Sequence, residues 1–304
     1  MITFFVLAGF FARLLMQKRT LGGFVANRLK RVGIPLVAFW PSTTAAIVAI
    51  MIVANMPAPG SPAAAAPPPP PPAFDANTFP LTHLWFLYVL LLLYAGAVVV
   101  KLVTDLTRIG GVLGRMLDKV VGVLTKSDLI VVVLAAPVAA VFYGNNAWMA
   151  WFGIQTPDMG LFPNLMAVAG FATAFKFGWW LNRRADLLDH LASRFWLYGI
   201  AAAAGTWWCL NHIGNVPVMV PTSGAEHPLY CVIYPLAAWS WALFLIGAGH
   251  LLIRKENPMV RFVSDASYWV YIVHLPLVLL VQWLVKDMAL EVEYKAALVI
   301  VGAL

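Results

Sequence analysis

One histidine of the chain, His274, lies inside an apolar stretch that reads Tyr271-Ile272-Val273-His274-Leu275-Pro276. It follows Asp265 by nine residues, or about 13 Å along a helix, which predicts a position near the middle of a membrane. A titratable group at that depth is costly and needs a reason. We predict that His274 is catalytic, handling a proton, and that Tyr271, one turn away, binds substrate; the alternative is a histidine hydrogen-bonded between helices. Pro276 frees a backbone carbonyl nearby.

A second histidine begins an aromatic segment, His83-Leu84-Trp85-Phe86-Leu87-Tyr88, at the outer end of another apolar run. Trp85 and Tyr88 are three residues apart and share a helix face, where their rings could stack on a sugar. We predict that His83, Trp85 and Tyr88 bind substrate. A polar residue at a membrane interface is also ordinary, and that alternative remains open.

Three basic residues, Arg28, Lys30 and Arg31, precede Pro35 at the inner mouth of a helix. Guanidinium groups bind phosphate oxygens bidentately, so this cluster is a candidate donor phosphate site. The alternative is simple anchoring of the helix end at the cytoplasmic surface.

Other motifs that carry chemistry are missing from the sequence. It contains no Walker loop, dinucleotide fingerprint or HExxH pattern, and we predict no metal site and no tightly bound cofactor. Two cysteines, Cys209 and Cys231, form neither a disulfide framework nor a zinc pattern, and we expect free buried thiols.

The candidate residues belong to apolar runs of about twenty residues, the length that crosses a hydrocarbon core. The runs cover 1–16, 36–55, 81–100, 129–144, 161–181, 195–213, 231–253 and 266–285, with a shorter one at 294–304. We therefore predict an all-α, polytopic transmembrane helix bundle with about eight complete helices and one partial helix.

The loops between these runs alternate in charge. Lys and Arg gather in the first, third, fifth and seventh loops, whereas 56–80, 145–160 and 214–230 contain neither. By the positive-inside rule the basic loops are cytoplasmic, as in a multi-pass protein of a bacterial inner membrane. The net charge of +7 is explained by this placement, and we expect no binding of nucleic acid.

Composition agrees with a membrane protein, because 62% of the 304 residues are hydrophobic and 11% are charged. A soluble chain of this length cannot bury that much apolar surface. A tract of prolines ending at Pro72 indicates an extended outer loop over 56–80. Because loop one is predicted inside, residue 1 would lie outside with no signal peptide ahead of it. We therefore expect a single transmembrane domain, 1–304, that is truncated at both ends.

Four segments resemble motifs of the acyltransferase-3 membrane family in the right order. They are Phe4-Phe5-Val6-Leu7-Ala8-Gly9-Phe10-Phe11, Arg28-Leu29-Lys30-Arg31-Val32-Gly33-Ile34-Pro35-Leu36, His83-Leu84-Trp85-Phe86-Leu87-Tyr88, and Ser267-Tyr268-Trp269-Val270-Tyr271-Ile272-Val273-His274-Leu275-Pro276. The resemblance covers nearly the whole chain, and within the family it is strongest to the glucan biosynthesis protein C branch, which succinylates periplasmic glucans.

The resemblance implies a bundle of ten helices that passes an acyl group from cytoplasmic acyl-CoA to a hydroxyl of an extracytoplasmic glycan. It also implies a catalytic histidine in the first helix, eleven positions after a basic residue. None of the six histidines here has Lys or Arg at that spacing. The expected truncation agrees with this departure, and it puts the activity of the present chain in doubt.

Two other classes of function compete with the acyltransferase. A histidine in mid-membrane beside a proline also suits a proton-coupled transporter or a flippase for glycans or acyl groups. Such carriers often contain paired repeats, and the two halves of this sequence show no similarity. A purely structural membrane subunit is disfavoured by the intramembrane His274.

Overall fold

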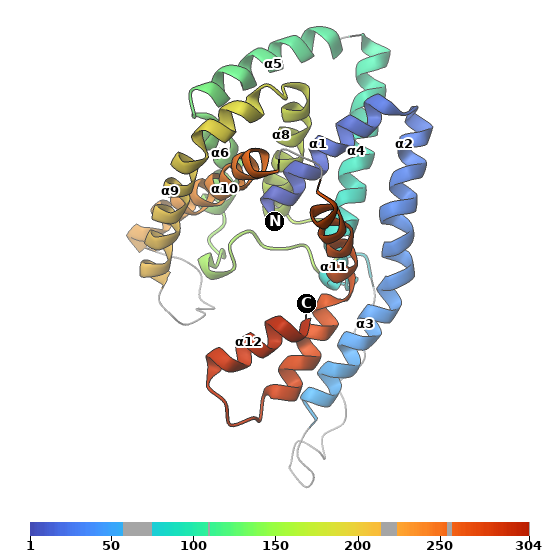
Figure 1. Ribbon diagram of the computed structural model, residues 1–304, viewed down its shortest axis with the longest axis vertical. Helices are drawn as coiled ribbons and strands as arrows, with labels where there is room; N and C mark the ends of the chain where they lie inside the picture. The colour runs from blue at the N-terminus through green and yellow to red at the C-terminus, as the bar shows by residue number, and fades with distance from the viewer. Residues whose placement is uncertain (57–74, 109, 214–223, 254–256, 304) are drawn as a thin grey trace. The chain divides into compact units, whose positions relative to one another are not determined.

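The computed structural model describes residues 1–56, 75–108, 110–213, 224–253 and 257–303 (Figure 1). Within them each predicted apolar run coincides with a helical segment and no extended sheet occurs, so the all-α, polytopic class is confirmed. Most of the proline-rich loop, 57–74, lies outside the described residues. Four described helical stretches are long and apolar enough to span a membrane: Leu21–Ala54, Thr82–Thr107, His227–Leu252 and Pro258–Val285. A bent pair raises this number to five if it counts as one span.

The chain forms two compact units that interleave in sequence. The first contains Met1–Arg28, Val89–Pro157 and Pro163–Lys255, and the second contains Leu29–Tyr88, Asp158–Phe162 and Glu256–Leu304. The long helix α4 (Trp85–Thr107) belongs to both, because its first turn falls in the second unit. Each unit is described by itself.

The first unit is a bundle of helices. Its elements are α1 (Ile2–Lys18), α2 (Leu21–Arg28), most of α4, α5 (Gly110–Lys126), α6 (Ile130–Tyr143), α7 (Leu165–Ala167), the π-turn η5 (Val168–Ala172), α8 (Thr173–Arg183), α9 (Leu187–Ile213) and α10 (His227–Leu252). The two longest of these, α9 and α10, pack along each other, and α6 lies against α10. Cys209 and Cys231 are free and buried in this unit, as predicted.

Helices α1 and α8 approach each other closely because glycine replaces a side chain on each. A Cβ atom on Gly9 would lie 2.0 Å from the carbonyl oxygen of Phe175, and one on Gly178 would lie 1.8 Å from that of Val6. Association of helices in lipid depends on such close packing, because lipid chains are as apolar as the side chains they replace.

The third basic loop differs from its predicted form, because most of it is helix α5. This amphipathic helix meets α6 at a bend of 102°. Arg183, at the end of α8, pairs with the Asp118 carboxylate of α5, and Arg184 Nη1 donates to the Asp118 carbonyl at 3.0 Å. Because α5 has one polar and one apolar face, its mean hydropathy is low, and a search for apolar runs misses this helix.

The second unit is built around helix α11 (Pro258–Val285), which packs against α3 (Ile34–Ala54) and α12 (Val292–Ala303). A π-turn, η1 (Leu29–Gly33), leads into α3, and a 3₁₀ turn, η3 (Thr82–Leu84), leads into α4. These turns position the basic residues and His83, respectively.

The chain before η3 is held by the short segment 158–161 of the same unit. Gly160 N–H donates to the Phe79 carbonyl at 2.8 Å, and Thr82 N–H donates to the Asp158 carbonyl at 2.9 Å. Gly160 has a φ of +81°, and a Cβ atom there would lie 2.8 Å from the Asn77 carbonyl oxygen. Glycine is therefore required at this position, both for its backbone conformation and for space.

Candidate functional site

Pro276, inside helix α11, leaves a backbone carbonyl that binds His83. Proline has no N–H, so the carbonyl of Ile272, four residues earlier, loses its ordinary helical partner. The Nε2 atom of His83 lies 2.8 Å from this oxygen, in a buried contact between residues 189 positions apart. A carbonyl can only accept, so His83 carries its proton on Nε2. The freed carbonyl predicted from sequence is thus the anchor of His83.

Tyr271 forms a second bond between the same two elements, in the opposite direction. Its hydroxyl donates to the backbone carbonyl of His83. The His83 side chain therefore binds the carbonyl of Ile272, the residue after Tyr271, while the Tyr271 side chain binds the His83 carbonyl, and the 3₁₀ turn η3 is tied to the middle of α11. Such paired polar contacts restrain the side chains more tightly than a single bond would.

His274 lies 16 residues after the start of α11 and 11 before its end, near the middle of the span. Its Nδ1 atom is 2.7 Å from the carbonyl oxygen of Tyr271, one turn back. The neutral ring therefore carries its proton on Nδ1 and a lone pair on Nε2. Among the described residues, none hydrogen-bonds Nε2, which leaves this nitrogen free to accept a proton.

The three predicted residues form one aromatic cluster. The rings of His83 and His274 meet edge to face with centroids 5.5 Å apart, and the Tyr271 ring lies 5.8 Å from that of His274. Phe86, on the first turn of α4, contacts Tyr271 at 5.4 Å. Tertiary folding thus brings His83, Tyr271 and His274 together, although their assigned roles stay predictions.

Two further aromatic residues, Trp40 and Phe79, lie next to η3 and were not predicted from the sequence. The indole N–H of Trp40 donates to the Pro80 carbonyl at 2.7 Å, and its ring stacks on Phe79 with centroids 4.7 Å apart. Thr82 beside them adopts a φ of +49°, which is strained for a β-branched residue. Strain of this kind persists only where the surroundings hold it and is common at functional sites.

The predicted sugar-stacking residues Trp85 and Tyr88 lie on the first turn of α4. Trp85 is buried, with 5% of its surface exposed. Tyr88 is half-buried, and its hydroxyl donates to the Leu161 carbonyl at 2.8 Å. Their assignment to substrate binding stays a prediction.

The residues of the predicted phosphate site are described within their own units. Arg28, in the first unit, places its guanidinium 5.2 Å from the ring centroid of Tyr94, and its Nε atom is buried without a hydrogen-bond partner. Lys30 and Arg31 are exposed on η1 in the second unit. Pro35 leaves the Arg31 carbonyl without a helical partner, and the Tyr268 hydroxyl donates to it at 2.9 Å. A role in phosphate binding stays a prediction.

Comparison with known proteins gives one match. The acyltransferase-3 family model, described as an acyltransferase domain, matches residues 1–303. No curated protein and no solved structure matches the chain. The family match covers both units and all the residues discussed above.

Proposed function

Because this chain belongs to the acyltransferase-3 family and is a membrane acyltransferase, we propose that it moves a succinyl or acetyl group from cytoplasmic acyl-CoA to a glycan hydroxyl. The acceptor would be an extracytoplasmic glycan, or another hydroxylated molecule, at a bacterial inner membrane. Similarity to the periplasmic-glucan branch favours succinyl transfer to a glucan. Acyl-CoA acts as a co-substrate and not as a bound cofactor.

The observation that carries this proposal is the free Nε2 lone pair of His274. A sugar hydroxyl is a poor nucleophile near neutral pH and needs a base. His274 Nε2 takes the hydroxyl proton while the oxygen attacks the thioester carbonyl, forming the ester bond and breaking the carbon–sulfur bond. The proton then passes to the departing thiolate, so the products are the acylated glycan and CoA. The bond from Nδ1 to the Tyr271 carbonyl holds the ring in the required tautomer.

The other predicted residues have supporting roles in this scheme. His83 and Tyr271 hold the base and bind the acceptor, and the aromatic residues Trp85 and Tyr88 add sugar contacts. At the cytoplasmic mouth of the helix, the basic residues Arg28, Lys30 and Arg31 bind the phosphates of the acyl donor. These assignments belong to the proposal, and they are supported by residue type and by the clustering of the first two residues with His274.

The test is the substitution His274→Gln, which keeps hydrogen-bonding capacity and nearly the same volume. Transfer of labelled acyl groups to purified glucan in liposomes should fall about a hundredfold, the low end for a proton-transfer group. Rates are normalised to folded protein by size-exclusion chromatography. His212→Gln is the matched control, because His212 Nδ1 also bonds a carbonyl one turn back, that of Trp208 at 2.8 Å, but at the exposed end of α9. It should retain full activity.

Two outcomes would contradict the proposal. Near-normal turnover in His274→Gln would make the residue a structural tie within α11. Counterflow of unmodified glucan or acyl donor through the same liposomes, without acyl transfer, would favour the proton-coupled carrier instead.

A further inference from the structure

A pocket of about 340 Å³ lies in the first unit, which contains none of the residues His83, Tyr271 and His274. Helix α9 lines it with Leu197, Ala201 and Gly205, helix α10 lines it with Ile233 and Ala237, and Asp128 closes one end. The volume falls in the range of small-molecule sites. Small residues on both helices create this space.

The pocket is elongated along the helices and open at the side. From Tyr198 to Gly205 it follows α9 for about 10 Å at 1.5 Å per residue. Ala201 lines it and is exposed, within the apolar run 195–213 that the sequence predicts to cross the membrane. Its walls are apolar apart from Tyr198, Ser240 and Asp128. A hydrocarbon chain can therefore enter from the bilayer and lie between α9 and α10.

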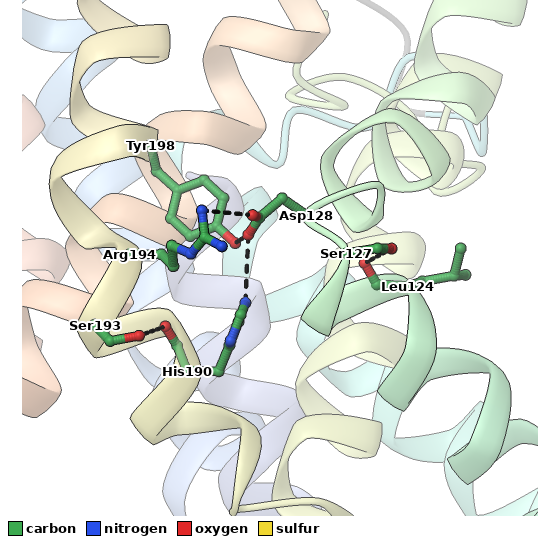
Figure 2. Close-up of polar contacts among 7 residues, drawn as sticks. All are labelled: Leu124, Ser127, Asp128, His190, Ser193, Arg194 and Tyr198. Atoms are coloured by element: carbon green, nitrogen blue, oxygen red, sulfur yellow. Dashed lines mark hydrogen bonds and ion pairs between the residues drawn. The ribbon is translucent and has the colours of Figure 1, made fainter.

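Charged groups gather at the Asp128 end (Figure 2). The Tyr198 hydroxyl donates to Asp128 Oδ1 at 2.6 Å, and His190 Nε2 lies 3.4 Å from the same oxygen. Arg194 Nη1 lies 3.4 Å from Oδ2, which is long for a hydrogen bond. Oδ2 can therefore accept a further donor. The Arg194 side chain is 46% exposed and is also able to bind a second partner.

The depth of this polar end matches a lipid headgroup. Asp128, with a φ of +60°, sits at the bend where amphipathic α5 meets apolar α6. Arg194 immediately precedes the apolar run 195–213 of α9. Both residues thus lie where polar surface gives way to hydrocarbon, whereas Gly205 lies deeper. An occupant must have a polar head at one end and an apolar chain at the other.

We propose that this pocket binds one chain of an ethanolamine phospholipid, whose ammonium group contacts Asp128 and whose phosphate contacts Arg194. A carboxylate and a guanidinium side by side complement a zwitterionic head. An anionic lipid such as phosphatidylglycerol satisfies Arg194 but offers no cation to Asp128. The site is independent of the proposed acyl transfer.

The test is competition between two lipids for delipidated full-length protein. Equimolar dioleoyl phosphatidylethanolamine and dioleoyl phosphatidylglycerol are added in detergent, and retained lipid is counted by native mass spectrometry. One ethanolamine lipid per chain should be retained, with a preference of about tenfold, as expected for one charge-assisted contact. Asp128→Asn should abolish the preference, since asparagine tolerates the positive φ and still accepts from Tyr198.

Pocket filling provides a second, matched measurement. Ala201→Phe, which places a ring in the pocket, should lower retention of the ethanolamine lipid at least tenfold. Ala203→Phe, at an exposed position of α9 that does not line the pocket, should leave retention unchanged. If Ala201→Phe does not fold, Ala201→Leu makes the same comparison.

Three results would overturn the proposal. One is equal retention by the Ala201 and Ala203 variants. Another is an unchanged lipid preference in Asp128→Asn. The third is stoichiometric displacement of bound lipid by palmitoyl-CoA, which would assign the pocket to an acyl donor.

Discussion

The bond between His83 and the Ile272 carbonyl exists because position 276 is proline, and this dependence can be tested. Replacing Pro276 by alanine provides an N–H at position 276, four residues after Ile272, where it can bond that carbonyl in the ordinary helical way. His83→Phe removes the donor and keeps a planar ring against Tyr271 and His274. We predict that His83→Phe destabilises the protein less in the Pro276→Ala background than in the native protein, because the new N–H at position 276 then satisfies the Ile272 carbonyl.

The magnitude follows from the environment of the bond. The contact is buried and 2.8 Å long, and leaving a buried carbonyl unpaired costs about 1–3 kcal/mol. Measured interhelical hydrogen bonds in membranes average about 0.6 kcal/mol and reach about 1.7. We therefore expect His83→Phe to cost about 1.5 kcal/mol alone and about 0.5 with Pro276→Ala, a coupling of about 1 kcal/mol.

The assay is unfolding by SDS in mixed micelles, followed by circular dichroism, for the four proteins of the double-mutant cycle. Tyr271→Phe is the control, because its bond to the His83 carbonyl does not involve the carbonyl freed by Pro276. It should cost the same in both backgrounds. Equal costs of His83→Phe in both backgrounds, within about 0.4 kcal/mol, would refute the argument that proline creates the anchor.

Three further predictions concern other parts of the chain. Changing Arg28 and Arg31 to Gln should raise the KM for acyl-CoA about tenfold or more per lost contact and leave the KM for the glycan unchanged. An unchanged KM for acyl-CoA at normal protein levels would show that these residues only anchor the helix end at the cytoplasmic surface. Cysteines placed in 56–80 should react with an impermeant maleimide in intact cells and those in 17–31 should not; the opposite pattern would reverse the orientation. Gly160→Ala should destabilise the protein by about 1–3 kcal/mol in the same SDS assay, since its φ is positive; no loss would show that the turn can relax.

Sequence alone predicted the parts of this protein that depend on local composition. Hydropathy over about twenty residues identifies a membrane helix without knowledge of its neighbours, because each helix satisfies its own backbone. For the same reason the position of His274 within its span and the carbonyl freed by Pro276 could be predicted. The class of function followed from four short motifs in order, and the family match over residues 1–303 agrees with it.

Amphipathic α5 shows where local composition fails. Its charged residues made it resemble a cytoplasmic loop, whereas in the structure its Asp118 pairs with Arg183, the last residue of α8, and with Arg184, the next residue. The Asp128 site was missed for a related reason. His190 and Asp128 are 62 residues apart, and neither stands out as a single residue in the sequence.

Only the tertiary structure decided which groups meet. The partner of the Ile272 carbonyl is 189 residues away, and no spacing rule joins His83 to α11. In lipid, hydrophobicity does not determine which helices pack together, because the lipid chains are as apolar as the side chains. Helix pairing therefore depends on close fit and on a few polar contacts. These are the glycines between α1 and α8, the carbonyls freed by proline, and the carboxylate at the α5–α6 bend, and each acts only once two distant segments have come together.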